Sequence, residues 1–380
     1  MKLIALRMLF GDRGKFFSIL LALTFSSQMI TQVSATFIGA MARTIANIRD
    51  AGIADIWVMD PGVRYLEDVR PLGSNDLYHV RSVPGVAWAV PYFKGSAKAK
   101  LRNGGFQTCL VLGLDDVTLA AGPPEMLEGR LENLRWPNSV IVDSYGANGK
   151  FAEQLGRPIR VGDEMEMNDQ RVVVAGICRV SRTFQSQPVV YATYSHATAL
   201  VPSERKSLSF VLVKANPNLQ SSEVCNRIRE STGLAAYTKY EFMRMTIIYY
   251  IRNTGVTINF LTAILITFVV GAVVAGQSFY SFTLDNLRHF GALKAMGAPD
   301  SLLMTMMLLQ SIVAAALSYG IGVGNASLFG YLTRNTEVSF LLPWQLLAGS
   351  AGAVLVMVMA SALFSMRRVM LVEPAEVFKG

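Results

Sequence analysis

The sequence predicts an α-helical membrane protein with four transmembrane helices, arranged as one plus three, and a large α+β domain between the first and the second. Four long stretches contain no Asp, Glu, Lys or Arg: 16–42, 253–284, 301–333 and 338–366. Each exceeds the roughly 20 residues that an apolar helix needs to cross the hydrocarbon core. The chain is 52% hydrophobic and only 16% charged, which is typical of a membrane protein with one extramembrane domain.

Residues 1–15 precede the first span and predict a short amphipathic helix. Apolar side chains surround Lys2 and Arg7, so this helix is expected to lie along the inner membrane surface. A cleaved signal peptide is the alternative for 16–42. The stretch is long, no small-residue cleavage site follows it, and polar side chains interrupt it, so an uncleaved helix is favoured.

Polar side chains recur at helical spacing within the first span. Such a stripe is costly against lipid, so we expect it to face other helices and to form interhelical hydrogen bonds. A substrate path is the alternative interpretation. The stripe consists of Thr24, Ser27, Gln28 and Thr31, with Ser34 beyond it.

The distribution of charge predicts that both termini are cytoplasmic. The net charge is +8, and basic residues gather beside the spans rather than in a pattern typical of nucleic-acid binding. The short loop 334–337 holds one Arg balanced by one Glu, so the positive-inside rule places it, and the domain 43–252, outside. The basic residues assigned to the inner side are Lys2, Arg7, Arg13, Lys15, Arg288, Lys294, Arg367, Arg368 and Lys379.

Alternating strand and helix patterns predict the α+β domain. A hairpin is expected around Asn103-Gly104, and helical segments at 43–51 and 240–252 are expected to run into the membrane at both ends of the domain. The charge-free run 183–203 lacks a continuous apolar core and predicts soluble strand and loop. Further strands are expected at 54–59, 86–101, 107–114, 139–143, 164–167, 171–177, 189–192 and 210–214, and helices at 74–82, 149–155 and 221–232.

Cys109, Cys178 and Cys225 lie in apolar contexts and form no metal-binding spacing. Buried unpaired thiols are favoured, and a Cys109–Cys178 disulfide is the alternative.

The third span contains a GxxxG spacing at Gly320 and Gly324, which permits close helix packing. The strongly polar residues of the second and third spans are uncharged. A proton- or ion-coupled carrier usually needs ionisable groups inside the membrane, so secondary transport is disfavoured. These uncharged polar residues are Asn259, Gln277 and Gln310.

No phosphate-binding loop, nucleophile elbow, HExxH helix or paired Cys/His metal spacing occurs in the sequence. The three histidines are isolated from one another. We therefore expect no enzyme activity, no metal and no cofactor in this chain, so any energy must come from a partner.

The most specific segment is 285–300, which reads as an interfacial amphipathic helix ended by Gly297 and Pro299. It resembles the corresponding loop of the FtsX-like, MacB-type permeases of ABC systems, R-x-x-E-[IF]-G-x-L-[KR]-A-[LM]-G-A. His289 replaces the usual acidic residue. The matching residues are Arg288, Phe290, Gly291, Leu293, Lys294, Ala295, Met296, Gly297 and Ala298.

The resemblance extends over essentially the whole chain. It includes the basic amphipathic start, the one-plus-three topology and the Asp-Pro-Gly turn at 60–62. The tail ending Pro-Ala-Glu-Val-Phe looks most like DevC-type permeases, which pair with a separate ATPase and a periplasmic adaptor.

The resemblance implies a homodimer in a bacterial inner membrane, with cytoplasmic termini and a periplasmic domain. The segment beginning at Asp285 would act as a coupling helix on an ATP-binding subunit, which binds ATP and Mg. Gly291 would allow close approach, Leu293 and Met296 would supply apolar contact, and Arg288 and Lys294 would face acidic groups.

The function implied is that of a permease subunit in an ATP-driven exporter with an adaptor and an outer-membrane channel. A lipoprotein-releasing permease and a non-transporting, FtsX-like regulator of a cell-wall hydrolase are the alternatives. A sensor or scaffold without an ATPase would leave the 285–300 segment without a purpose.

Overall fold

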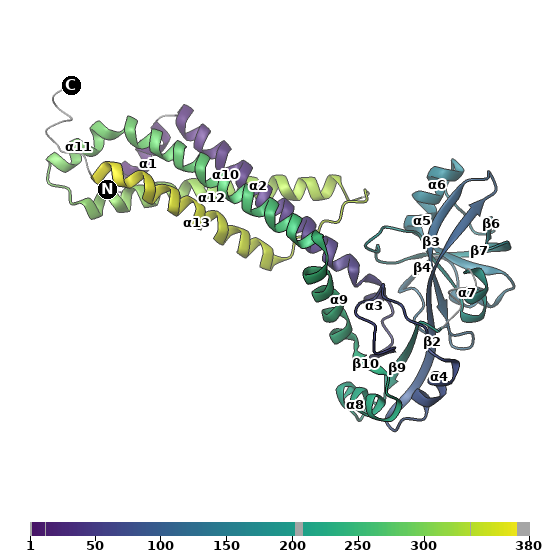
Figure 1. Cartoon of the computed structure of the whole chain (residues 1–380). Coiled ribbons are helices and arrows are strands. Elements are labelled where there is room, and N and C mark those ends of the chain that lie inside the picture. Colours follow the sequence, from purple (N-terminus) through teal and green to yellow (C-terminus); the bar gives the residue numbers. More distant parts are fainter. Residues whose placement is uncertain (1, 12, 202–207, 335, 371–380) are drawn as a thin grey trace. The chain divides into compact units, whose positions relative to one another are not determined.

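The computed structural model describes residues 2–11, 13–201, 208–334 and 336–370. The chain forms two compact units. We call Met1–Ala40 with Gly255–Gly380 the membrane unit, and Met41–Thr254 the extramembrane unit. Figure 1 labels the helices and strands of both.

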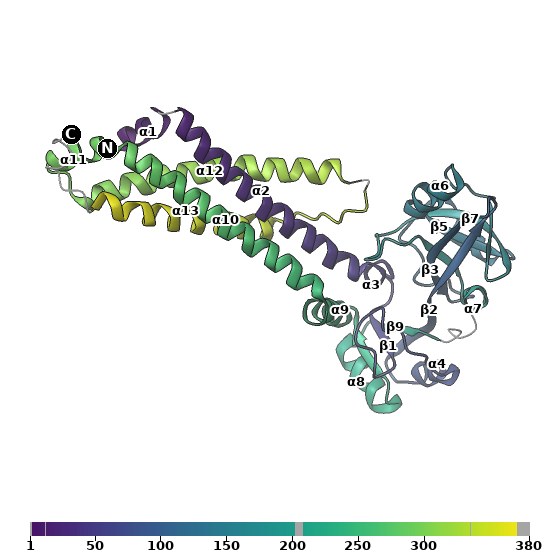
Figure 2. The same cartoon turned by 45° about the horizontal axis from the view of Figure 1, so that its top comes forward.

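Among its described residues, the membrane unit contains four helices long and apolar enough to cross a membrane. Figures 1 and 2 show these helices side by side. The one-plus-three arrangement is confirmed, because the first precedes the extramembrane unit and three follow it. They are α2 (Arg13–Thr44, whose last residues belong to the extramembrane unit), α10 (Gly255–Asp285), α12 (Asp300–Leu332) and α13 (Trp344–Met370); the short helices are α1 (Lys2–Gly11) and α11 (Leu287–Ala295).

Small residues bring the long helices together. A Cβ built on Gly271 of α10 would lie 2.5 Å from Ser26 Oγ, and one built on Gly322 of α12 would lie 2.7 Å from Ser27 Oγ. Helices in a bilayer associate through such close approach, since lipid tails are as apolar as leucine. These two contacts therefore hold α2 against α10 and α12.

The connection from α12 to α13 is longer than the predicted loop 334–337. Residues 338–343 lie outside any helix or strand, so the prediction of helix from 338 is wrong. Leu341 N–H donates to the Ala35 carbonyl at 3.1 Å, and the Pro343 carbonyl accepts from Leu346 N–H at 3.0 Å. The helix starts after Pro343 because proline disfavours helical geometry in the residue before it.

The extramembrane unit is built on a ten-stranded sheet with the order β10-β1-β9-β2-β3-β8-β5-β7-β4, and β6 pairs with β2 and β7. The 16-residue strand β2 connects two parts, because its first half pairs with β9 and its second half with β3 and β6. The strands are β1 (Ile56–Met59), β2 (Val86–Leu101), β3 (Phe106–Leu114), β4 (Glu125–Gly129), β5 (Ser139–Asp143), β6 (Glu164–Met167), β7 (Gln170–Arg179), β8 (Val189–Thr193), β9 (Phe210–Ala215) and β10 (Ala235–Thr238).

One part is a closed barrel. The pairs β2–β3, β3–β8, β8–β5, β5–β7, β7–β6 and β6–β2 complete a ring. Closure leaves no free edge within the ring and encloses an apolar core. Each strand contributes to one buried cluster, through Phe93, Val111, Val190, Val142, Val174 and Met165.

The other part is a sheet of β10, β1, β9 and the start of β2. Helices α4 (Ser74–Arg81) and α8 (Ser221–Thr232) pack on it, with Val80 and Ile228 buried against Ile56 and Val58 of β1. Trp57 of β1 faces the opposite side and lies 5.5 Å from the Phe242 ring of α9 (Lys239–Asn253). All four residues of β1 are therefore buried, which explains its unbroken apolar run.

The helical ends of the domain differ from the prediction. The 240–252 helix does not run unbroken into the second span: α9 ends at Asn253, and Thr254 is extended with φ −117° and ψ 146°. Thr254 Oγ1 donates to the Tyr250 carbonyl, which closes the helix end. Likewise Ile45 separates α2 from α3 (Ala46–Asp50).

The charge-free run 183–203 is only partly as predicted. The run 183–203 contains strand β8, as expected, but also helix α7 (Tyr194–Leu200) where a loop was predicted.

The three cysteines are free and buried, which overturns the disulfide alternative. Cys178, Cys109 and Cys225 belong to three different core clusters. The unpredicted elements in the described residues are β4, β10, the 3-10 helix η1 (Leu131–Arg135) and α5 (Ser144–Asn148), while the predicted 149–155 helix is α6 (Lys150–Leu155).

Candidate partner-coupling site

The segment between the second and third spans folds as the nine-residue helix α11 with a defined end. Gly297 has φ +90°, a left-handed conformation that glycine adopts at low cost. Gly297 N–H donates to the Lys294 carbonyl and Ala298 N–H to the Leu293 carbonyl, both at 3.0 Å. This is the Schellman pattern of helix termination, and Pro299 then directs the chain into α12.

Two residues predicted to contact a partner are instead buried inside the chain. Phe290 is 1% exposed and forms a cluster with Leu303 and Met307 of α12, and Gly291 is also buried. Leu293 is partly buried against the same cluster. Phe290 therefore fixes α11 to α12, and the close approach of a partner at the buried Gly291 stays a prediction.

The remaining predicted residues define an exposed face. Asp285, Arg288, His289 and Gly297 are exposed, and Met296 has 75% of its surface exposed. Lys294 is partly buried, and its Nζ lies 3.2 Å from Asp300 Oδ1 at the start of α12. The apolar Met296 side chain and the basic side chains therefore lie on one surface, and the buried Phe290 fixes the helix that carries them.

Helix α1 packs beside this segment, as sequence reasoning did not predict. The Gln310 amide of α12 donates to the Ala5 carbonyl at 2.7 Å, and Met8 packs against the Phe290 cluster. Figures 1 and 2 show α1 and α11 at the same end of the membrane unit. Gln310 was visible in the sequence as a rare polar residue of the third span, but its partner was not.

The polar stripe of α2 is partly as predicted. Ser27 and Thr31 are fully buried, so the stripe faces other helices. The hydroxyls of Thr24, Ser27 and Thr31 have no hydrogen-bond partner among the described residues, whereas Gln28 accepts a long bond from Asn325 at 3.4 Å. Packing rather than hydrogen bonding is therefore the main contribution of this stripe.

The GxxxG prediction names the wrong glycines for packing inside the chain. Gly320 and Gly324 are exposed, and no atom of the described chain lies within 4 Å of a Cβ built on either. Gly322, between them, is the residue in close contact with α2. A helix places residues two apart on different faces, so the pattern alone could not select the packed face.

In the extramembrane unit, the two segments nearest its chain ends are tied together. Asp50 of α3 accepts from Ser181 N–H at 2.6 Å and from Ser181 Oγ at 2.8 Å. Lys239 Nζ, at the start of α9, donates to the Arg49 carbonyl at 3.0 Å. Burial lowers the pKa of Lys239, but the ammonium keeps this carbonyl and nearby carboxylates as partners.

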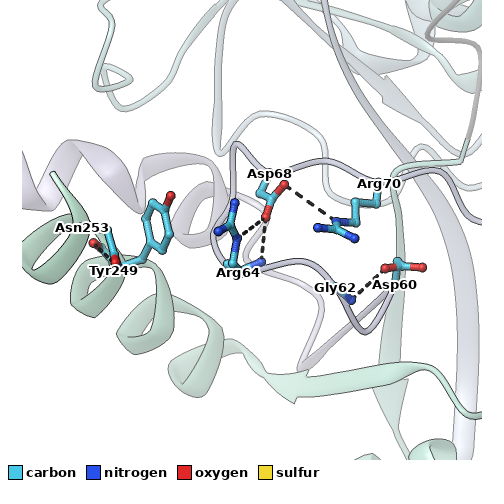
Figure 3. A network of polar contacts seen from close by, with 7 residues as sticks. All are labelled: Asp60, Gly62, Arg64, Asp68, Arg70, Tyr249 and Asn253. Carbon is cyan, nitrogen blue, oxygen red and sulfur yellow. Dashed lines mark hydrogen bonds and ion pairs between the residues drawn. The ribbon is translucent and has the colours of Figure 1, made fainter.

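A loop after β1 holds the far end of α9. Tyr65 stacks on Tyr249 with ring centroids 3.9 Å apart, and Arg64 lies over the same ring at 5.5 Å. Arg64 Nε also donates to Asp68 Oδ2 at 3.0 Å, while the Asp60 carboxylate accepts from Gly62 N–H in the preceding turn (Figure 3). The Asp-Pro-Gly turn recognised in the sequence thus starts a loop that packs on α9.

No group of three or more His, Cys, Asp or Glu side chains in the described part of the chain is placed to hold a metal ion.

Two family descriptions match the chain. "MacB-like periplasmic core domain" matches residues 17–231, and "FtsX-like permease C-terminal" matches residues 258–374. Two uncharacterized ABC transporter permeases of Mycobacterium tuberculosis are 24% and 23% identical over 313 residues, which is 82% of this chain and 80% of each relative.

Solved structures with similarity include the periplasmic region of MacB from Actinobacillus actinomycetemcomitans. It is 17% identical, with a TM-score of 0.39, and the match covers 55% of this chain and 97% of that one. The extracellular domain of the ABC-type transporter YknZ from Gram-positive bacteria is 15% identical, with a TM-score of 0.35, covering 49% and 98%. From the two family matches, which together span most of the sequence, the chain belongs to the FtsX-like, MacB-type family of ABC transporter permeases.

Proposed function

We propose that this chain is the permease subunit of an ATP-driven ABC exporter, and that the exposed face of α11 is where it receives motion from a separate ATP-binding subunit. Family membership implies such an ATP-binding partner. The observation that carries the proposal is the construction of α11: Phe290 is buried at 1% exposure while Met296 is 75% exposed. A helix that is packed on one side and exposed on the other can bind a partner through its exposed side and transmit the partner's motion as a rigid element.

The polarity of the spans supports an external source of energy. The stretches 253–284 and 301–333 contain no ionisable Asp, Glu, Lys or Arg. Proton- and ion-coupled transport normally uses such groups within the bilayer, so ATP hydrolysis by the partner, with its bound Mg, is the favoured source.

The motion would pass along α10 and α2 toward the extramembrane unit. Thr254 breaks the helix between α9 and α10, so a change in the membrane unit would reach α9 through a joint rather than one rigid rod. Within the extramembrane unit, the Lys239–Arg49 contact would then move α3 and α9 together, and the Asp50–Ser181 contact would pass the motion of α3 to the segment after β7. The chain would thus act by mechanotransmission, without binding ATP itself.

The remaining elements of the proposal follow from charge and family. The basic residues beside the spans support a topology in which both termini are cytoplasmic and the extramembrane unit is periplasmic. We further propose a homodimer in the bacterial inner membrane that works with a membrane-fusion adaptor and an outer-membrane channel. The exporter would move a hydrophobic or amphipathic substrate from the periplasm outward.

Affinity purification of the tagged full chain from gently solubilised membranes tests the proposal. The wild type should recover an ATP-binding subunit, and the double variant Arg288→Glu with Met296→Asp should lose it. Both positions are exposed, so their substitution leaves the packing of the partly buried Leu293 intact. The matched control is Arg160→Glu with Val161→Asp, an exposed basic and apolar pair in the extramembrane unit.

The proteins that accompany the ATPase separate the alternatives. An adaptor supports export, a second permease supports lipoprotein release, and a cell-wall hydrolase supports regulation. Failure of the wild type to recover any ATPase, while a control ABC complex survives the same detergent, would contradict the coupling proposal.

A further inference from the structure

We infer that the N-terminal helix α1 is a positioning element for α11: Gln310 holds it on α12, and Met8 links it to the cluster beneath the coupling segment. Its consequence for ATPase binding rests on the proposed function, but the positioning itself does not. The coupling site would then require three elements, α1, α11 and the start of α12, rather than the loop between two spans alone.

The first contact is the Gln310 side chain. Gln310 is 2% exposed, and its Nε2 donates to the Ala5 carbonyl at 2.7 Å. A buried amide in apolar surroundings is costly without a partner, so this bond favours one placement of α1 over others. Ala5 and Leu9, one turn apart, are both 0% exposed, which places a continuous strip of α1 in the interior.

The second contact is Met8. Its side chain packs against the cluster formed by Phe290, Leu303 and Met307. Phe290 is the buried anchor of α11, so α1 helps to close the apolar pocket in which that anchor lies. A displacement of α1 would open one side of this pocket.

The two contacts are connected through one face of α12. Leu303, Met307 and Gln310 are spaced by four and three residues, which places them on the same side of the helix. Leu303 and Met307 hold the α11 anchor, and Gln310 holds α1. The same helix face therefore sets the position of α1 and of α11 together.

The test is hydrogen exchange on the full-length permease without an ATPase, comparing wild type with Gln310→Met. Methionine has a similar size but no N–H donor. Backbone amides of both α1 and α11 should exchange about three- to tenfold faster, the factor expected from one buried hydrogen bond. The matched control is Ser318→Ala, which removes a different buried contact of α12, from Ser318 Oγ to the Leu20 carbonyl of α2. It should leave α11 unchanged.

A second variant tests the Met8 link separately. Met8→Ala should speed exchange in α11, whereas Phe10→Ala, at a 45%-exposed position of the same helix, should not. Unchanged α11 exchange in both Gln310→Met and Met8→Ala would overturn the inference, even if α1 itself loosens.

The two proposals fail in different ways. ATPase affinity, measured on the same variants, should fall by about the same three- to tenfold factor in Gln310→Met and stay unchanged in Ser318→Ala. If exchange responds as expected but the wild-type chain binds no ATPase, the positioning role stands and the coupling function is wrong. If the ATPase binds wild type and Gln310→Met equally, α1 does not position the docking surface.

Discussion

The two units of this chain bury polar groups in different ways. In the extramembrane unit two ionisable side chains are buried with specific partners: Lys94 forms an ion pair with Glu67, and Asp143 accepts from the Val189 and Gly146 N–H groups. In the membrane unit the buried polar groups are uncharged, and the helices meet through small residues such as Gly271 and Gly322. In water, burial of any apolar surface stabilises the fold. In lipid, which is itself apolar, helix association is stabilised only by close packing and by hydrogen bonds between polar atoms.

The coupling segment combines both kinds of packing. Phe290 is buried as in a water-soluble core, yet the neighbouring Arg288 and His289 are exposed. A segment at the end of a membrane unit can therefore have a rigid inner side and a solvated outer side, which suits binding to a partner protein.

The largest effect should come from removing the anchor of α11. Phe290→Ala should destabilise the local packing by about 3–5 kcal/mol, the usual cost of truncating a buried phenylalanine. Met296→Ala should cost little, because that side chain is 75% exposed. Hydrogen exchange of α11 measures both; similar protection in the two variants would show that Phe290 does not anchor the helix.

The comparable substitution in the extramembrane unit is Glu67→Gln, which breaks the ion pair with Lys94. It leaves the Lys94 ammonium, whose side chain is only 4% exposed, without its carboxylate, and the expected cost is about 3 kcal/mol. Glu166→Gln removes an exposed partner of Lys100 and should cost at most about 1 kcal/mol. Thermal unfolding of the two variants, followed by tryptophan fluorescence, measures the difference, and equal melting temperatures would count against a buried pair.

Helix packing in the membrane unit should respond to which glycine is changed. Gly322→Leu places a side chain against Ser27 and should cost about 1–3 kcal/mol through overpacking. Gly320→Leu, two residues away on an exposed face, should have little effect on the folded monomer. Unfolding in detergent micelles measures the stability of both variants. A larger loss of stability in Gly320→Leu than in Gly322→Leu would contradict the close contact of Gly322 with α2.

The most gradual effect should be the pH dependence of stability due to Asp143, because it is spread over the range between the unfolded and the folded pKa of this carboxyl. Burial raises the pKa of this carboxyl to about 6, above its ordinary value of 3.8, although backbone N–H donors oppose the shift. Since the folded state holds the proton more tightly, stability should fall as pH rises from about 4 to 6, by at most about 1.4 kcal/mol per pH unit. In Asp143→Asn this contribution should vanish. A slope that persists unchanged in the variant would assign it to another group.

The sequence predicted most of the elements for physical reasons that the structure makes visible. Charge-free runs located the spans, and a continuous apolar run located strands such as β5, because burial on both faces leaves no polar alternation. The edge strand β4 was missed because its residues are mostly exposed and carry two glutamates. Pairing partners such as β2 with β6 depend on contacts between distant segments, which periodicity does not encode.

The candidate site was predicted in place but not in orientation. The motif located α11, yet it could not show that Phe290 and Gly291 face inward while Met296 faces outward. The Gln310 bond to Ala5 joins residues 305 positions apart, so no local pattern could reveal it.

The most direct test of the central claim is site-specific photocrosslinking from position 296. A photoreactive amino acid replacing Met296 in the full chain should crosslink to the ATP-binding subunit in membranes. The same probe at the 79%-exposed Tyr240 of the extramembrane unit should not. If position 296 gives no ATPase product while the intact complex is recovered from the same membranes, the exposed face of α11 is not the coupling surface.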